Sequence, residues 1–309
     1  MLSRVADSLY WMSRYFERAE NCARVLEATY NLMLNPARLA PDHRWHRALI
    51  YLGLPADQEH GDPQGALLRL AGDAQLRASL VSCISAAREN AGQVREVVSS
   101  EMWERLNRLF HEVTKSVVDD EESVMNRVAA VREAAYSFHG ITDATMNHGE
   151  GWHFIRLGKF TERACALCLL LDAYFSTRLP ADDLDWISLL TSCAAFEAYC
   201  KACTADLKPE RIAAFLLLEP EFPYSVRYAT DRMQTALNGI GQQSPTGNTG
   251  EIERIIGRLR ASLTYAKIGE LIAGDLHVFL NSIVEQCRNL HSAVQEVYID
   301  YPVEAALEI

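Results

Sequence analysis

Residues 2–33 read LSRVADSLYWMSRYFERAENCARVLEATYNLM, and their apolar side chains recur at alternating steps of three and four positions. This spacing places one apolar seam along an α-helix about 45 Å long, at 1.5 Å per residue. We expect Ser3 as its N-cap, and we expect the helix to stop before Pro36, because proline cannot continue a helix. The seam consists of Leu2, Val5, Leu9, Met12, Phe16, Ala19, Ala23, Leu26, Tyr30 and Met33.

The same helix contains an eight-residue phrase that occurs twice. Residues 12–19 read MSRYFERA, and residues 157–164 read LGKFTERA. The matching positions run apolar, small, basic and aromatic, followed after one mismatch by an identical Glu-Arg-Ala. The two glutamates are 145 residues apart, close to half of the chain. We therefore expect two pseudo-repeated halves, about 1–146 and 147–309, each contributing one Glu-Arg pair to a shared interior.

The composition predicts an all-α fold. Only 16 of the 309 residues are Gly and 10 are Pro, whereas Ala, Leu, Glu and Arg, which favour helix interiors, are abundant. No shift in composition marks a linker, so residues 1–309 are expected to form a single all-α domain, a multi-helix bundle with long helices. Besides the first helix we expect helices at about 42–52, 73–90, 100–118, 121–146, 150–177, 183–205, 251–269 and 270–299. A short helix should also begin at 209, and another helix should end at about 238.

Charge and hydropathy narrow the location and the partners. The formal net charge is −11, which opposes binding to a phosphate backbone, so nucleic acid is not an expected partner. The N-terminal residues lack the apolar core of a signal peptide, and no later apolar run has the ~18 residues that a membrane span needs. We expect a cytoplasmic protein that does not cross a membrane.

Two cysteine pairs have CxxC spacing, Cys165 with Cys168 and Cys200 with Cys203. Both lie in apolar helical runs, where free cysteines commonly pack as small apolar side chains, although a helical dithiol metal site stays an alternative. Residues 150–153 read EGWH, the ExxH spacing of bundle metal sites, but no second ExxH accompanies it. No metal and no cofactor are expected, since phosphate-loop, dinucleotide and nucleophile-elbow motifs are lacking as well.

A second, polar face accompanies the apolar seam of the first helix. Tyr10 and Trp11 lie on it beside the charges, which indicates that the face is covered and that its charges find partners. If a pseudo-twofold axis relates the two copies, Glu17 meets Arg163 or Arg156, and Glu162 meets Arg18 or Arg14. The face carries Asp7, Tyr10, Trp11, Arg14, Glu17, Arg18, Asn21 and Arg24, and the stripe in the second copy carries Trp152, Arg156, Lys159, Glu162 and Arg163.

Two hypotheses for this cluster stay open. In the first it is a structural network of ion pairs that specifies how the helices pair. In the second it is a pocket in which basic groups hold a carboxylate, a phosphate or a peptide terminus, and Glu17 or Glu162 serves as the catalytic acid or base. The candidate ligand-binding residues are Tyr10, Trp11, Arg14, Arg18, Asn21, Trp152, Arg156, Lys159 and Arg163.

Three stretches resemble the bacterial Alpha-E family of helical proteins. They are residues 1–21, MLSRVADSLYWMSRYFERAEN, residues 146–164 with MNHGEGWHF and LGKFTERA, and residues 222–227, FPYSVR. The resemblance covers essentially the whole chain. This chain departs from the family pattern after Met146, where NHG replaces a basic residue followed by an acidic one, and at Lys159, where Arg is more usual. If the missing charge binds a ligand, His148 is a weak substitute or the specificity differs.

The resemblance implies a bacterial protein encoded beside, or fused to, a circularly permuted ATP-grasp protein, and often near a transglutaminase-like protein. Such a setting is typical of systems that form or process amide or peptide bonds. The first functional hypothesis is a helical partner that binds the ATP-grasp protein or its peptide product and presents a substrate. The alternative is an enzyme acting on a peptide or amino-acid derivative, with Glu17 or Glu162 as acid-base group and arginines as an anion clamp. The lack of a recognised nucleophile, metal set or cofactor motif favours the partner.

Overall fold

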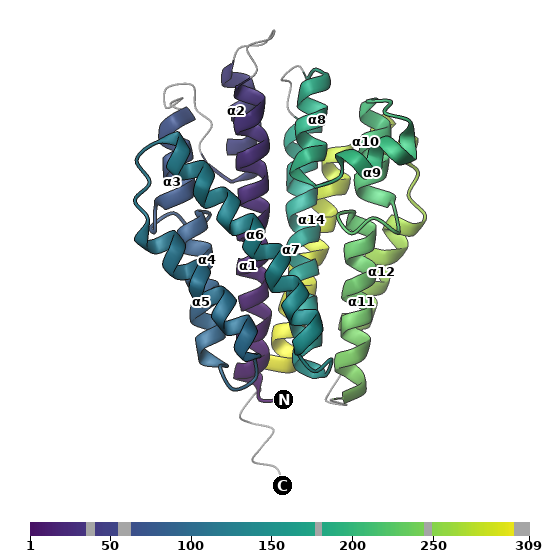
Figure 1. Cartoon of the computed structure of the whole chain (residues 1–309). Helices are drawn as coiled ribbons and strands as arrows, with labels where there is room; N and C mark the ends of the chain where they lie inside the picture. Colours follow the sequence, from purple (N-terminus) through teal and green to yellow (C-terminus); the bar gives the residue numbers. More distant parts are fainter. Residues whose placement is uncertain (35–40, 55–62, 177–180, 244–248, 300–309) are drawn as a thin grey trace.

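The computed structural model (Figure 1) describes residues 1–34, 41–54, 63–176, 181–243 and 249–299. These residues contain fourteen α-helices and no strand, so the prediction of an all-α fold is confirmed. The first half holds α1 (Ser3–Met33), α2 (Pro41–Tyr51), α3 (Pro63–Gly72), α4 (Leu80–Gln93), α5 (Ser100–Lys115) and α6 (Glu121–Thr145).

The second half begins with α7 (Glu150–Phe175), which carries the second copy of the repeated phrase and is second in length only to α1 among the described helices. It is followed by α8 (Asp183–Ser192), α9 (Phe196–Cys203), α10 (Pro209–Leu218), α11 (Val226–Gln243), α12 (Gly250–Thr264), α13 (Ile268–Ala273) and α14 (Leu276–Val294). The last helix continues into a short π-helical turn, Gln295–Ile299.

Helices α1 and α7 lie side by side at the centre of the molecule (Figure 1). Helices α4 and α6 pack on α1 and are bridged by α5, while α11 and α14 pack on α7 and are bridged by α12. The halves also interlock, because α2 packs on α7 and α8 packs on α1. Arg47 of α2 and Asp185 of α8 form a buried ion pair with a distance of 2.8 Å. The origin of the halves as two copies stays a prediction.

The two central helices touch at small side chains. The hydroxyl of Ser13 donates a hydrogen bond of 2.7 Å to the carbonyl oxygen of Ile155. A Cβ atom on Gly158 would lie 2.3 Å from the carbonyl oxygen of Tyr10 and 2.4 Å from Ser13 Oγ, so only glycine fits there. Ser13 and Gly158 occupy the same position of the repeated phrase. This close contact brings the Glu-Arg pairs, one turn further along each helix, within reach of each other.

Several predicted helix ends were wrong in the first half. Leu2 is the N-cap of α1, and Ser3 is the first helical residue with no capping hydrogen bond from a side chain. The helix expected at 73–90 begins at Leu80, because the Ser79 side chain accepts a hydrogen bond from the amide of Ser82 and caps it. Helix α3 was not predicted at all.

Two long helices expected in the second half are interrupted. The one expected at 183–205 is divided into α8 and α9 by Ala194, whose φ of 50° lies in the left-handed region. The one expected at 270–299 begins only at Leu276, because the Asp275 side chain accepts a hydrogen bond from the amide of Val278. Local caps, which periodicity does not detect, place these ends.

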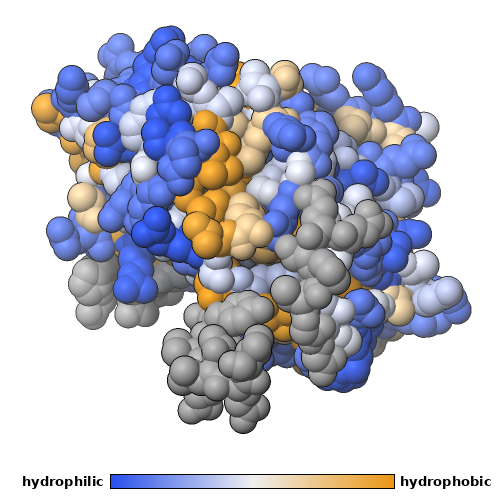
Figure 2. Space-filling model, turned by 90° about the horizontal axis from the view of Figure 1, so that it is seen from below, coloured by the Kyte–Doolittle hydropathy of each residue, from blue (hydrophilic) through white to orange (hydrophobic). Residues whose placement is uncertain are grey.

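None of the described helices combines the length and the apolar character that crossing a membrane requires. Seen from below, the surface has an apolar strip between hydrophilic flanks (Figure 2). The chain begins at this end of the molecule (Figure 1), where Met1 and Leu2 are exposed. The two Glu-Arg pairs described next lie further along α1 and α7.

Candidate functional site

Glu17 and Arg163 form a buried ion pair between α1 and α7. Arg163 Nε donates to Glu17 Oε1 at 2.6 Å, and Arg163 Nη2 donates to Glu17 Oε2 at 2.9 Å. The side chains of Glu17 and Arg163 are 0% and 4% exposed. Two parallel bonds between a guanidinium and a carboxylate fix both groups in distance and in plane. The pair therefore fixes the register of the two central helices.

Glu162 forms the reciprocal contacts on the opposite side of the contact between α1 and α7. Arg14 Nε donates to Glu162 Oε2 at 2.8 Å, and Arg18 Nε donates to Oε1 at 2.6 Å. Burial raises the pKa of Glu162, but the charges of Arg14 and Arg18 outweigh it and hold that pKa below its usual value. The predicted pairing of each glutamate with the arginines of the other copy is confirmed.

The two sides differ at one position of the phrase, where the first copy has Arg14 and the second has Lys159. Within the described part of the chain, Lys159 forms no hydrogen bond and no ion pair, and it is only partly exposed. Burial, together with the charge of Arg163, lowers the pKa of Lys159 to about 8, although Glu17 opposes this. The Glu17 side thus keeps one cation that no direct contact neutralises.

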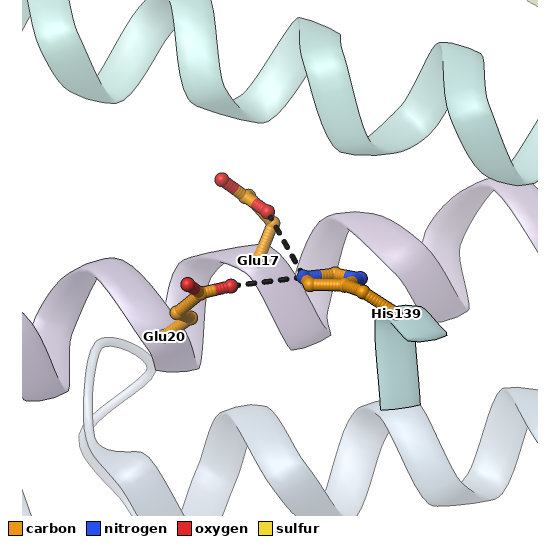
Figure 3. A group of neighbouring side chains, drawn as sticks. All are labelled: Glu17, Glu20 and His139. Atoms are coloured by element: carbon orange, nitrogen blue, oxygen red, sulfur yellow. Dashed lines mark hydrogen bonds and ion pairs between the residues drawn. The ribbon is translucent and has the colours of Figure 1, made fainter. Parts of the chain in front are cut away.

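A second carboxylate lies one turn after Glu17 and was not predicted as a site residue. Arg24 donates to Glu20 Oε1 from Nε at 3.1 Å and from Nη2 at 2.8 Å, and the hydroxyl of Tyr224 donates to the same oxygen. His139 of α6 points at both carboxylates of α1 (Figure 3): its Nε2 lies 2.9 Å from Glu20 Oε2 and 3.7 Å from Glu17 Oε2. Burial acts to raise the pKa of Glu20, but His139, Arg163 and Arg24 outweigh it and hold that pKa well below its usual value.

Glu17, Glu20 and His139 offer three atoms within 4.8 Å of one another, the one such group in the described residues that could hold a metal ion. Arg163 already occupies both oxygens of Glu17, and Arg24 neutralises Glu20. A divalent cation would add charge where the guanidiniums already balance the carboxylates. The group is therefore best described as a hydrogen-bonded network of carboxylates and imidazole.

A cavity of about 240 Å³ opens beside Glu162, on its side of the contact between α1 and α7. Arg18 and Glu162 line it together with Tyr51, Cys165 and the exposed Arg77. The side chain of Arg18 is 33% exposed, in contrast to the enclosed Arg163. The two Glu-Arg pairs thus do not share one pocket: one is packed inside the protein and the other borders a cavity.

Tyr10 and Trp11 face α14. The ring of Tyr10 is buried and stacks on His291 at 5.5 Å between centroids, and Trp11 meets the same imidazole edge-on at 5.2 Å. The guanidinium of Arg14 lies 4.9 Å from the centre of the Trp11 ring. Asn21 is also buried, and its Nδ2 has no hydrogen-bond partner among the described residues. Tyr10, Trp11 and Arg14 thus border the Glu162 side.

Trp152 and Arg156 lie nearer the start of α7. Trp152 Nε1 donates to Asp143 Oδ1 at 3.2 Å, and Arg156 Nη1 lies 3.6 Å from the same oxygen. The guanidinium of Arg156 also stacks over the Trp152 ring at 4.7 Å. Of the two partners expected for Glu17, the structure thus selects Arg163, and Arg156 contacts α6 instead.

The site residues that were not predicted from the sequence differ in how clearly the sequence marks them. Glu20 and Arg24 follow Glu17 at helical spacing, and Arg24 was on the predicted polar face, so both could have been included. Tyr224 lies in the stretch FPYSVR, which resembled a family motif. His139 left no signal, because it enters the cluster from a helix more than one hundred residues away.

Comparison with known proteins identifies one family. The model of Alpha-E, described as a predicted alpha-helical domain with a conserved ER motif, matches residues 1–299. Uncharacterized proteins of Mycobacterium tuberculosis and Mycobacterium bovis are 23% identical over 319 aligned positions, which cover 95% of this chain. The chain spans only 36% of the length of these relatives. No solved structure matches it significantly.

Proposed function

This chain belongs to the Alpha-E family, and we propose that it is a helical, substrate-presenting partner of a circularly permuted ATP-grasp protein. The system would form or process amide or peptide bonds in the bacterial cytoplasm, and a transglutaminase-like protein would be a second partner. The observation that carries this proposal is the reciprocal use of the two Glu-Arg pairs. Each glutamate is bound by arginine from the other half, which favours a rigid scaffold over a reacting centre.

The ligand in this proposal is a peptide with an anionic end, and Lys159 is its anchor. Lys159 is the cation of the repeated phrases that no described residue pairs with directly. Arg156, one turn before it, has its one described ion pair with the exposed Asp143 at 3.6 Å. A carboxylate placed between these two cations would relieve their mutual repulsion and restore the charge balance that Arg14 finds with Glu162.

The alternative is an enzyme that uses Glu17 and Glu162 as acid-base groups and the arginines as an anion clamp. The neutral His139 beside Glu17 and Glu20 favours it, since burial and the charge of Lys159 lower the pKa of that imidazole. Against it, both oxygens of Glu17 accept hydrogen bonds from Arg163 and the side chain is 0% exposed. A substrate could reach Glu17 only after the ion pair opened.

Three measurements test the proposal. The tagged chain should co-purify with the ATP-grasp protein encoded beside it, and the isolated chain should not turn over any peptide. In calorimetric titration, N-acetyl-dialanine should bind and its C-terminal amide should not. Lys159→Met should weaken binding of the carboxylate by at least about tenfold, the share of a charge-assisted contact, whereas Lys201→Met, an exposed lysine of α9, should leave it unchanged.

The outcomes separate the hypotheses. Peptide turnover by the isolated chain, lost in Glu17→Gln, would support the enzyme and end the partner proposal. Equal binding of the carboxylate to the Lys159 and Lys201 variants would remove Lys159 as the anchor, even if the ATP-grasp protein still co-purified.

A further inference from the structure

The arginines of the two Glu-Arg pairs differ in how many of their nitrogens find a partner. Arg163 donates from Nε and Nη2 to Glu17, and from Nη1 to the carbonyl oxygen of Pro223. Arg18, at the same position of the repeated phrase, bonds Glu162 through Nε at 2.6 Å. Its two terminal nitrogens form no hydrogen bond in the part of the chain that the structure describes. Arg18 therefore keeps donors that a ligand can use.

Two more donors line the cavity that Arg18 borders. They are the hydroxyl of Tyr51, at the end of α2, and the exposed guanidinium of Arg77, in the turn before α4. Neither side chain forms a hydrogen bond or an ion pair among the described residues. Burial raises the pKa of Tyr51 well above its usual value, so its hydroxyl keeps its proton and can donate it. Donors from three separate segments thus surround one cavity.

Positive charge exceeds negative charge around this cavity. Glu162 is the one acidic group among the described residues that line it. Arg14 and Arg18 share the single charge of Glu162, and Arg77 adds a further cation. An anion in the cavity would offset this excess. A guanidinium can bind a carboxylate through two parallel N–H bonds, so a carboxylate suits these donors.

The rest of the lining and the size of the cavity define the remainder of the ligand. Apart from two thiols, the other lining residues are apolar: Leu52, Ala78, Ala166 and Leu169. At ~30 Å³ for each water of the liquid, the volume of about 240 Å³ holds about eight non-hydrogen atoms. Once a carboxylate is placed, room remains for an apolar chain of about five carbons.

We propose that the cavity beside Glu162 binds a short-chain carboxylate, which Arg18, Arg77 and the Tyr51 hydroxyl hold while its apolar chain packs on the opposite lining. This site goes beyond the proposed function, because the peptide anchor Lys159 does not line the cavity. The recognised group has two sources, a free short-chain acid and the apolar C-terminal residue of a peptide.

Calorimetric titration of the full chain tests the site with hexanoate. Hexanoate should bind, and hexanamide, which has the same shape without the charge, should bind at least about tenfold more weakly. Butanoate lacks two methylenes and should bind up to about fifteenfold more weakly. N-acetyl-leucine represents the end of a peptide, so the tighter binder of hexanoate and N-acetyl-leucine identifies the source of the group.

Variants of the donors test which side chains hold the carboxylate. Arg77→Met should weaken hexanoate binding about two- to fivefold, the share of an exposed ion pair. Arg258→Met, at an exposed arginine of α12, is the matched control and should leave binding unchanged. Tyr51→Phe keeps the ring and removes the donor, so it should weaken hexanoate binding by about tenfold or more.

The same titrations separate this site from the peptide anchor. Lys159→Met should leave hexanoate binding unchanged, and Arg77→Met should leave binding of N-acetyl-dialanine unchanged. The proposal is wrong if hexanoate does not bind, or if hexanamide binds equally well. It is also wrong if neither Arg77→Met nor Tyr51→Phe weakens the binding of hexanoate.

Discussion

Replacing Glu17 by Gln tests whether the buried Glu-Arg pair holds the two central helices together. The substitution keeps the shape of the side chain but removes its charge, and it leaves the guanidinium of Arg163, 4% exposed, without its bidentate carboxylate. Removing one partner of a buried ion pair costs about 3–5 kcal/mol. In a chain of this length ~2 °C of melting temperature corresponds to each kcal/mol, so Tm should fall by about 6–10 °C.

Glu162→Gln is the matched control for this prediction. Of its two partners, Arg14 is 12% exposed and Arg18 is 33% exposed, so water replaces part of the lost interaction, and a smaller cost of about 1–2 kcal/mol is expected. Differential scanning calorimetry at pH 7 compares both variants with the wild type. A Glu17→Gln variant that melts within about 2 °C of the wild type, or no lower than Glu162→Gln, would refute the structural role. Loss of function with unchanged stability would instead favour a ligand site at Glu17.

Three further predictions concern the contact between α1 and α7 and the residues around it. Gly158→Ala should lower the free energy of unfolding by about 1–3 kcal/mol in urea titration, because its Cβ would lie 2.3 Å from the Tyr10 carbonyl oxygen, whereas Gly257→Ala, with nothing within 4 Å, should not destabilise the chain. Lys159→Met should raise Tm at pH 7, because burial and Arg163 lower the pKa of Lys159 to about 8 and its charge therefore destabilises the folded state. The gain in Tm should shrink as pH rises from 8 towards 10.5, since the folded wild type loses this proton and recovers its stability. A gain in Tm that does not vary with pH would contradict this. Tyr224→Phe removes a hydrogen bond to the Glu20 carboxylate and should cost about 1.5–3 kcal/mol, with Tyr136→Phe, whose exposed hydroxyl meets Arg24, as the milder control in the same urea titration.

Much of the site followed from helical spacing and repetition. The apolar seam of residues 2–33 predicted a long first helix, and α1 covers Ser3–Met33. The repeated phrase predicted reciprocal pairing of the glutamates and arginines, because two related helices that cross at equivalent positions bring equivalent side chains together. The close contact of Ser13 with Gly158 realises that crossing. The prediction succeeded because the two copies of the phrase supply the glutamates and arginines on both sides of the contact.

Other parts of the site could not be predicted in this way. His139 and Tyr224 come from segments with no counterpart in the repeated phrase, so nothing in their local pattern marks them as neighbours of Glu20. The helix breaks at Ala194 and before Leu276 depend on single backbone torsions and caps, which apolar periodicity over a long window does not register.

The sequence alone thus establishes the helical class, the two central helices and the charges that they bring to their contact. Tertiary packing decides which of these charges find a direct partner. Among the described residues Lys159 is left without a direct partner, although Arg14 at the same position of the phrase has one. The physical reason is that helical spacing fixes the direction of each side chain, whereas the neighbour that lies in that direction depends on how distant helices pack.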